Sequence, residues 1–281
     1  MYHLANLNTT ERKRGTMSGT NKPSLQLLER AITILDFIAF KTGSLSFTEI
    51  VEGTGISKPS VHRILATLGN FRILVRDEQG GYILGPRIIG WSRSCIQSHG
   101  LLSVAKPWLD RIWNEVGETL HLVSFEDEQA YYLFKMESRH PLQMRSRMGD
   151  PIALHSTAAG KAILFSLPED KLGSILKKIN LNPKTKKTIT DPVALKEQLQ
   201  SFRTQGFSEE VEENEQDIRC MAAPILNNRG FPVGAVSITC PTYRCDDLKA
   251  QKMGKFLAET LPNLSYELGY NPQKIQGGVT I

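Results

Sequence analysis

The chain of 281 residues is long enough for one large or two smaller domains, and its hydrophobic (40%) and charged (22%) contents are typical of a globular protein. The net charge of +5 is concentrated near the N-terminus, where the first 91 residues contain 11 Lys and Arg against 7 Asp and Glu, which favours a polyanionic partner at that end. No apolar run reaches the ~18 residues that a membrane span needs and the N-terminus lacks a hydrophobic signal core, so we expect a cytoplasmic protein that does not contact a membrane.

The four cysteines, Cys95, Cys220, Cys240 and Cys245, show no paired CxxC spacing, and His121, His140 and His155 show no metal-ligand spacing. A disulfide framework is also uncommon in a chain of this size. We therefore expect no structural disulfide, no metal site and no cofactor.

Residues 1–23 are polar and carry a short ERKR run, which predicts a flexible tail, with a secondary phosphate contact as the alternative. The first ordered element is predicted from Ser24 onward. Apolar residues then recur every three or four positions from Leu28 to Ala39, including Ile32, which is typical of a helix facing a core.

Residues 46–68 predict a helix-turn-helix. Ser46–Glu49 is a capping box that predicts a short helix ending near Glu52, and Gly53–Gly55 breaks it. Ser57 is predicted to cap a following helix, whose first turn tolerates Pro59 because the missing N–H would have no partner there. Two short helices joined by a glycine turn make this motif.

The segment ISKPSVHRILATL, residues 56–68, is predicted to form a helix with one apolar face and one polar face. Val61, Ile64, Leu65 and Leu68 are predicted to be buried, whereas Pro59, Ser60, Arg63 and Thr67 lie opposite, with Lys58 and His62 at the flanks. The alternative is an ordinary solvated helix face. The hairpin predicted at 73–84, with its glycine-containing tip, adds a wing and favours a recognition helix.

A linker helix is predicted at 88–103, followed by a second domain at 104–272 and a tail at 273–281. The second domain is predicted to be α+β, with a mostly antiparallel sheet. Its predicted helices include 156–167 and a long final one at about 245–268. Its predicted strands are TLHLVSF, AYYLFKME, LQMRSRM, RCMAAPIL and VGAVSIT.

These motifs together resemble those of the IclR family of bacterial transcriptional regulators. The N-terminal half carries TEIVEGTGISKPSVHRILATL and a wing ending in YILG, and the C-terminal half carries RMGDPIALHSTAAGKAIL and GFSEEVEENEQDIRCMAAPIL. Within the family, MRSRMG and KKTIT are most similar to KdgR-type regulators of sugar-acid catabolism. Two departures stand out: Pro59 replaces a small residue, and Asp217 replaces a glycine.

The resemblance implies a winged helix-turn-helix domain at 24–87 and a GAF-like effector-binding domain around a central antiparallel sheet. The residues expected to contact DNA are Thr48, Ser57, Lys58, Ser60, His62, Arg63 and Arg76. We expect the recognition helix to carry readout and anchoring, and the wing to touch the DNA backbone.

An anion site is predicted where Ser156–Lys161 begins a helix, because small side chains leave its N-terminal N–H groups accessible. Ser237 and Thr239 share one face of a strand. With the resemblance, the expected effector contacts are His155, Thr157, Ala158, Ala159, Glu210, Cys220, Ser237 and Thr239. The alternatives are packing for Cys220 and His155, and plain solvent exposure for the hydroxyls.

The predicted function is a sequence-specific DNA-binding regulator, a repressor rather than an activator, that is not an enzyme. We expect its effector to be a small carboxylate, a sugar acid or keto-acid such as 2-keto-3-deoxygluconate, and its partners to be double-stranded operator DNA and further copies of the chain in a homodimer or homotetramer. Two alternatives stay open: a ligand-binding module without DNA activity, and a thiol-dependent enzyme using Cys220.

Overall fold

The computed structural model describes residues 23–39, 41, 43–98, 100–141 and 146–271. The chain divides between Cys95 and Ile96 into two compact units. The two predicted tails lie almost wholly outside the described residues. The predicted linker segment 88–103 contains parts of two helices, α4 (Pro86–Ser98) and α5 (Gly100–Val116).

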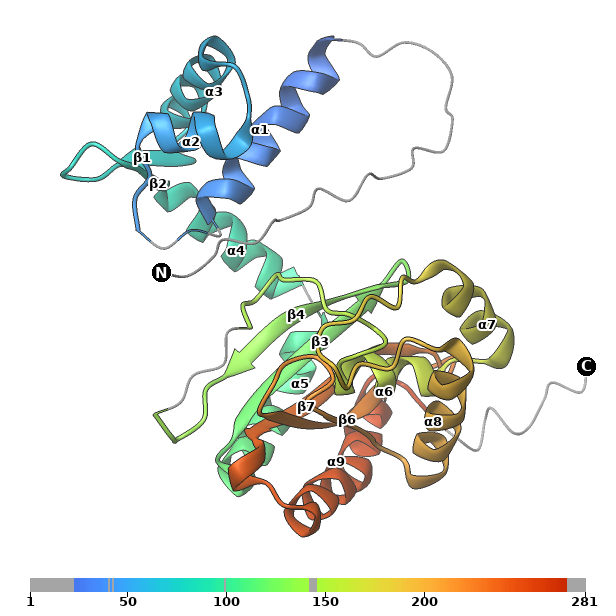
Figure 1. Cartoon of the computed structure of the whole chain (residues 1–281). Helices are drawn as coiled ribbons and strands as arrows, with labels where there is room; N and C mark the ends of the chain where they lie inside the picture. The colour runs from blue at the N-terminus through green and yellow to red at the C-terminus, as the bar shows by residue number, and fades with distance from the viewer. Residues whose placement is uncertain (1–22, 40, 42, 99, 142–145, 272–281) are drawn as a thin grey trace, which may run out of the picture. The chain divides into compact units, whose positions relative to one another are not determined.

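The first unit has the predicted winged helix-turn-helix order (Figure 1). Its elements are α1 (Pro23–Ala39), α2 (Phe47–Thr54), α3 (Lys58–Asn70), β1 (Leu74–Arg76) and β2 (Tyr82–Leu84), followed by α4. The capping box is formed, since the Ser46 N–H donates to Glu49 Oε2 at 2.8 Å and the Glu49 N–H donates to Ser46 Oγ at 3.3 Å. Gly55 ends α2 in the left-handed region, with φ 66°, where glycine is strain-free.

The core of this unit contains the predicted stripe of α3, since Val61, Ile64, Leu65 and Leu68 are all buried. The predicted core face of α1 is wrong in part. Ile34 and Ile38 are buried, but Leu28 and Ile32 are 58% and 50% exposed. A spacing of three to four residues defines a helix face, but it does not say which of two adjacent apolar faces the core covers.

The second unit is built on a five-stranded antiparallel sheet in the order β4-β3-β7-β6-β5. Its strands are β3 (Thr119–Glu126), β4 (Gln129–Met136), β5 (Ser208–Val211), β6 (Ile218–Leu226) and β7 (Pro232–Pro241). Its further helices are α6 (Ala158–Ser166), α7 (Glu169–Lys178), α8 (Pro192–Gln205) and α9 (Asp247–Glu267), with a short 3-10 turn at Thr242–Arg244. The α+β class with a central antiparallel sheet is confirmed.

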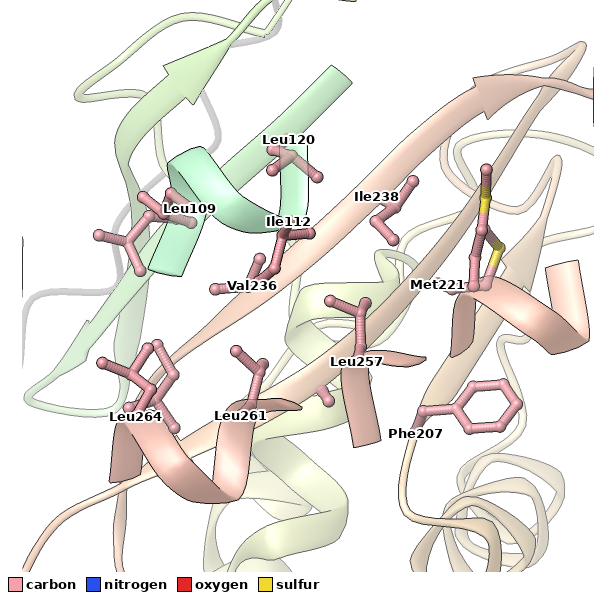
Figure 2. Packing of buried hydrophobic residues seen from close by; sticks show 14 of the residues in the cluster. Leu109, Ile112, Leu120, Phe207, Met221, Val236, Ile238, Leu257, Leu261 and Leu264 are labelled. Atoms are coloured by element: carbon pink, nitrogen blue, oxygen red, sulfur yellow. The ribbon is translucent and has the colours of Figure 1, made fainter. Parts of the chain in front are cut away.

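The two faces of the sheet carry different cores. Alternate residues of β6 and β7, such as Met221, Val236 and Ile238, pack with α5 and α9, and Figure 2 shows this packing around Leu257 and Leu261. Intervening residues of the same strands, such as Ala222 and Ala235, face α6 in a second cluster, which residues of α7 and α8 complete. The polar residues on these intervening positions therefore lie on the α6 side of the sheet.

Two strand predictions need correction. In LQMRSRM, residues 142–145 lie outside the described part, and residues 146–148 form coil and turn rather than strand. Conversely, β5 (Ser208–Val211) was not predicted, because four residues with two adjacent glutamates give no clear alternation of apolar and polar side chains.

Candidate functional site

The exposed end of α3 carries three of the predicted DNA contacts. Lys58, His62 and Arg63 are all exposed, and no Asp or Glu lies in α3. The His62 ring meets Phe47 of α2 edge-on, with ring centroids 6.4 Å apart, which restrains its direction. Basic side chains without acidic neighbours at the start of a helix suit phosphates and guanine edges.

Ser60 corrects the sequence-based view of this helix. It was predicted to lie on the exposed face, but it is only 7% exposed. Its Oγ accepts a hydrogen bond from Ser57 Oγ at 3.0 Å and one from Arg30 Nη1 of α1 at 3.3 Å. Ser60 is buried because α1 packs against this side of α3. The spacing of apolar residues within α3 alone cannot show that contact.

Ser57 occupies the N-cap position but makes no side-chain capping bond, since its hydroxyl is directed to Ser60 instead. Thr48 is exposed in the first turn of α2. Both residues therefore lie on the same compact unit as the recognition helix, without a contact that fixes their role.

The wing places Arg76 as predicted, on an exposed strand position. Its guanidinium donates to Tyr82 Oη at 2.7 Å and stacks 4.9 Å from the centre of that ring. Arg72, which was not among the predicted contacts, is also exposed and adopts a positive φ of 57° between α3 and β1. His62, Arg72, Arg76 and Tyr82 line a groove of about 360 Å³ between α3 and the wing.

A small cavity of about 40 Å³ in the second unit gathers seven of the eight predicted effector contacts. It lies at the N-terminus of α6 on the α6 face of the sheet. Its predicted lining residues are Thr157, Ala158, Ala159, Glu210, Cys220, Ser237 and Thr239.

The register of the sheet explains this convergence. Glu210 of β5 pairs with Cys220 of β6, Cys220 pairs with Thr239 of β7, and Ser237 pairs with His121 of β3. Directly opposed residues in an antiparallel sheet point to the same face. Four strands thus present one row of polar side chains beneath the start of α6.

Gly160 allows the first turn of α6 to pack closely against the backbone of the segment that precedes the helix. A Cβ at this position would lie 2.5 Å from the backbone of Leu154. The hydroxyl of Thr157 caps the helix by accepting from the Gly160 N–H at 3.0 Å. Gly160 is therefore required for close backbone packing at this helix start, and the predicted access of an anion to the helix end stays a prediction.

His155 is the one predicted effector residue that does not line this cavity. Its ring Nε2 lies 3.0 Å from the carbonyl of Asn182, and it borders a separate groove with Lys184. Proximity in sequence to Thr157 was misleading, because the turn before α6 directs neighbouring side chains to different sides.

The lining residues that sequence reasoning missed are His121, Tyr132, Ser146, Asn214, Glu215 and Ile218. His121 is central among them, since its Nδ1 lies 3.5 Å from Ser237 Oγ and 3.4 Å from Thr239 Oγ1. Its Nε2 lies 2.7 Å from Ser146 Oγ. A histidine alternating with apolar residues in the predicted strand 119–125 was the available signal.

Burial shifts the pKa values of three titratable side chains that line the cavity. It lowers the pKa of His121 to about 3, so the imidazole is neutral at physiological pH. Burial also raises the pKa of Glu210 to about 7, against the opposing effect of the Glu213 backbone N–H that donates to its carboxylate at 2.8 Å. Burial likewise raises the pKa of the Cys220 thiol, which leaves it protonated and a poor nucleophile.

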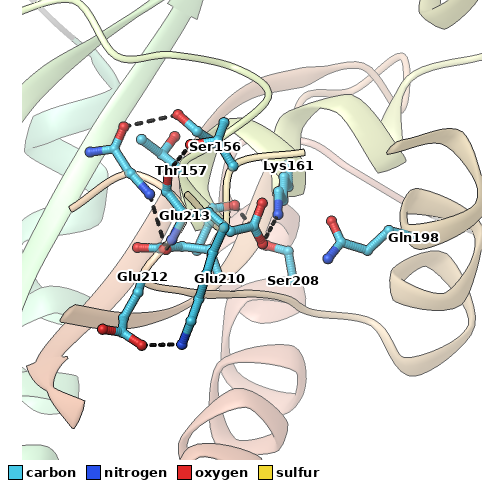
Figure 3. A network of polar contacts seen from close by, with 12 residues as sticks. Ser156, Thr157, Lys161, Gln198, Ser208, Glu210, Glu212 and Glu213 are labelled. Carbon is cyan, nitrogen blue, oxygen red and sulfur yellow. Dashed lines mark hydrogen bonds and ion pairs between the residues drawn. The ribbon is translucent and has the colours of Figure 1, made fainter. Parts of the chain in front are cut away.

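Below the cavity, the loop after β5 is tied to its surroundings by polar contacts, which Figure 3 shows. The Lys161 ammonium of α6 pairs with the Glu213 carboxylate, and both are buried. Ser156 Oγ donates to Asn214 Oδ1 at 2.9 Å, and Thr188 Oγ1 donates to the carbonyl of Glu213 at 2.6 Å. The loop that supplies Asn214 and Glu215 to the cavity is thereby fixed on α6 and on the KKTIT segment.

Asp217 closes this loop in a left-handed conformation, with φ 63°. Its N–H donates to Glu212 Oε1 at 3.1 Å, and its carbonyl accepts from the Thr242 N–H at 2.8 Å. Aspartate is one of the few residues other than glycine that visit this region readily. Asp217, which stands where the family pattern has a glycine, therefore keeps the backbone conformation that a glycine would adopt.

Among the described residues, no group of three or more His, Cys, Asp or Glu is placed to hold a metal ion. Within the same part of the chain, no helix is both long and apolar enough to cross a membrane.

A winged helix-turn-helix unit joined in one chain to an α+β unit with a polar cavity is an architecture typical of a transcription regulator. The model of the IclR helix-turn-helix domain matches residues 27–78, and the model described as bacterial transcriptional regulator IclR C-terminal matches residues 93–266. The chain belongs to the IclR family of bacterial transcriptional regulators.

Relatives match over nearly their whole length. The regulator XynR of Escherichia coli (strain K12) is 31% identical over 88% of this chain and 99% of its own, and the transcriptional repressor IclR of the same strain is 29% identical over 92% and 95%. The crystal structure of Thermotoga maritima IclR has a TM-score of 0.76 and 32% identity, covering 88% of this chain and all of that one. These relatives are regulators and not enzymes, in agreement with the predicted class.

The C-terminal domain of the Escherichia coli regulator KdgR is also similar, with a TM-score of 0.54 and 29% identity over 60% of this chain and 99% of that one. This likeness agrees with the family and supports the KdgR-like subgroup only weakly.

Proposed function

We propose that the protein is a repressor that reads its operator with α3 and responds to a small carboxylate bound in the cavity of the second unit. Lys58, His62 and Arg63 are the proposed readout and anchoring residues, and Arg76 is the proposed backbone contact of the wing. Their exposure on one unit supports these roles. Ser60 is reassigned to holding α3 on α1, because it is buried.

The observation that carries the effector proposal is the convergence of seven predicted residues on one cavity at the start of α6. The first N–H groups of a helix have no partner inside the helix and favour an anion. The hydroxyls of Thr157, Ser237 and Thr239 suit the keto and hydroxyl groups of a sugar acid. This combination supports a sugar acid or keto-acid such as 2-keto-3-deoxygluconate as the effector.

A homodimer is the proposed minimal assembly, with a tetramer as its extension. The support is the uncovered apolar side of α1, where Leu25, Leu28 and Ile32 are each at least half exposed. A dimer would present two recognition helices to a palindromic site. The effector would act by binding one arrangement of the units more tightly than another.

The test measures binding of the full chain to a labelled duplex that carries the DNA upstream of its own gene, by fluorescence anisotropy at several salt concentrations. We expect binding that weakens steeply with salt, and a shift in affinity on adding 2-keto-3-deoxygluconate. Lys252→Gln, at an exposed position of α9 in the second unit, serves as the charge control for Lys58→Gln.

Binding that is absent at every salt concentration would indicate the ligand-binding module without DNA activity. Turnover of a keto-acid by the purified protein, abolished by Cys220→Ser, would indicate the thiol-dependent enzyme. Either result contradicts the proposed function.

A further inference from the structure

Glu210 places a buried acidic side chain in the cavity where the effector is proposed to bind. It is 2% exposed and lines the cavity from β5. Its Oε2 accepts the backbone N–H groups of Glu213 at 2.8 Å and of Asn214 at 3.4 Å, so the carboxyl group is held in one orientation. A second anion beside it would meet an ionised carboxylate at short range in a poorly solvated site.

No positive charge among the described lining residues compensates the repulsion between an ionised Glu210 and an effector carboxylate. Among the described lining residues, the acidic ones are Glu210 and Glu215, and there is no Lys or Arg. The ammonium of Lys161 is nearby but is committed to Glu213. The titratable groups around the cavity are Cys220 of β6, His121 of β3, Tyr132 of β4, Lys161 of α6, and Glu213 and Glu215 of the loop after β5. Lys135 of β4 lies at the edge of the cavity, where its ammonium donates to the carbonyl of Ser146 at 3.0 Å.

We propose that Glu210 recognises the effector in its carboxylic acid form, donating its O–H to the effector carboxylate, so that binding takes up a proton from solution wherever Glu210 is ionised in the free protein. This inference rests on the proposed function, in which the effector is a small carboxylate. The O–H bond at Glu210 is the only covalent bond that forms. The same side chain would disfavour a ligand anion whenever it is ionised, which makes it a residue that determines affinity as a function of pH.

Burial places the pKa of Glu210 near neutrality, unlike the pKa values of His121, Tyr132 and Cys220 in the same cavity. Burial keeps His121 neutral, with a pKa of about 3, and keeps the Tyr132 phenol protonated by raising its pKa. The pKa of the Cys220 thiol is raised as well. Glu210, with a pKa of about 7, is half ionised near pH 7 in the free protein.

The pH dependence follows from this assignment. Below about pH 6 the acid is already protonated, so the Kd for a carboxylate is independent of pH. Above about pH 7 the complex must recruit a proton, and the Kd rises by about tenfold between pH 6 and pH 8. The carboxyl groups of the ligands stay ionised across this range, since α-carboxyl groups titrate near 3.5.

The experiment is isothermal titration calorimetry of the full chain with 2-keto-3-deoxygluconate, gluconate and pyruvate at pH 6 and pH 8. Each titration is run in two non-phosphate buffers whose ionisation enthalpies differ, MES and Bis-Tris at pH 6 and HEPES and Tris at pH 8, so that the heat reports the number of protons exchanged. For the tightest of the three acids we expect about 0.9 protons taken up at pH 8 and about 0.1 at pH 6.

Glu210→Gln keeps a hydrogen-bond donor and removes the titration. We expect this variant to bind the same acid with a Kd that changes less than about twofold between pH 6 and pH 8, without proton uptake. Glu209→Gln is the matched control. It lies next to Glu210 on β5, but its carboxylate contacts Arg219 rather than the cavity, so the tenfold dependence should remain.

The outcomes separate the inference from the proposed function. If one acid binds without proton uptake at pH 8, or binds more tightly at pH 8 than at pH 6, the role of Glu210 is wrong while the effector class stands. If proton uptake persists in Glu210→Gln, another group takes the proton. If none of the three acids binds at either pH, both proposals fail. Even where a variant folds poorly, the measurement on the unmodified protein can overturn the proposal, because binding without proton uptake at pH 8 contradicts it.

Discussion

Lys161 and Glu213 form an ion pair in the interior of the second unit, with 0% and 8% of their side chains exposed. The pair joins α6, whose first turn lines the cavity, to the loop that positions Glu210 through the Glu213 N–H. The second carboxylate oxygen of Glu213 is buried without a hydrogen-bond partner among the described residues. The pair therefore acts as a link between two walls of the cavity, and its stability depends on both partners being present.

Removing one partner of this pair should be costly. We expect Lys161→Met to lower the free energy of unfolding of the second unit by about 3–5 kcal/mol, because it leaves a buried carboxylate uncompensated. Lys178→Met, which breaks the exposed pair with Glu128, should cost at most about 1 kcal/mol. Urea unfolding followed by tryptophan fluorescence measures both. Adding Glu213→Leu to Lys161→Met should restore part of the loss, and an undiminished loss would contradict the paired-charge explanation.

Arg63 and Ser60 should separate DNA recognition from stability. If Arg63 reads a base, Arg63→Ala should weaken operator binding by about 1–3 kcal/mol without changing the melting temperature. Ser60→Ala should instead lower the melting temperature slightly, because it removes the acceptor of the Ser57 and Arg30 bonds. Anisotropy titrations and thermal unfolding measure the two effects, and unchanged affinity for Arg63→Ala would remove that residue from the proposed readout.

Replacing Asp217 with glycine should barely change the stability of the protein, whereas replacing it with a β-branched residue should lower it. Its φ of 63° is compatible with glycine, so Asp217→Gly should change the free energy of unfolding by less than about 1 kcal/mol. Asp217→Val should cost about 1–2 kcal/mol, because a β-branched side chain is strained in this region. Equal stabilities of the two variants in denaturant unfolding would show that the loop relaxes to a different conformation.

His121 should make the second unit sensitive to acid. Its pKa is lowered to about 3 in the folded protein, whereas it is about 6.5 in an unfolded chain. Unfolding therefore takes up a proton at pH values between these two, and the stability contributed by the neutral ring is lost progressively as the pH falls below 6.5. The limiting slope for this one group is about 1.4 kcal/mol per pH unit.

His121→Phe tests this dependence through the slope and not the absolute stability, since the variant also loses the contact with Ser146. We expect the unfolding free energy of the variant to fall less steeply than that of the unmodified protein between pH 7 and pH 5. Parallel slopes would mean that other groups account for the acid sensitivity.

Local sequence determined the elements of the first unit. The capping box at Ser46–Glu49 and the glycine at position 55 fix helix ends through contacts within a few residues, so they can be read without knowing the rest of the fold. The buried stripe of α3 was equally readable, since its four apolar residues repeat at helical spacing. Motifs spread over both halves of the chain were sufficient to indicate the family.

Tertiary structure decided which of these residues face one another. Ser60 is covered because Arg30 arrives from α1, and His155 is turned away from the cavity although it lies two residues from Thr157. His121 meets Ser237 only through the register of β3 on β7. A pairing between strands more than a hundred residues apart leaves no local pattern, because it depends on how the whole sheet is assembled. The sequence by itself therefore determined the kinds of elements and seven of the thirteen residues that line the cavity. The packing of those elements determined the neighbours and the burial of each side chain, and hence its protonation.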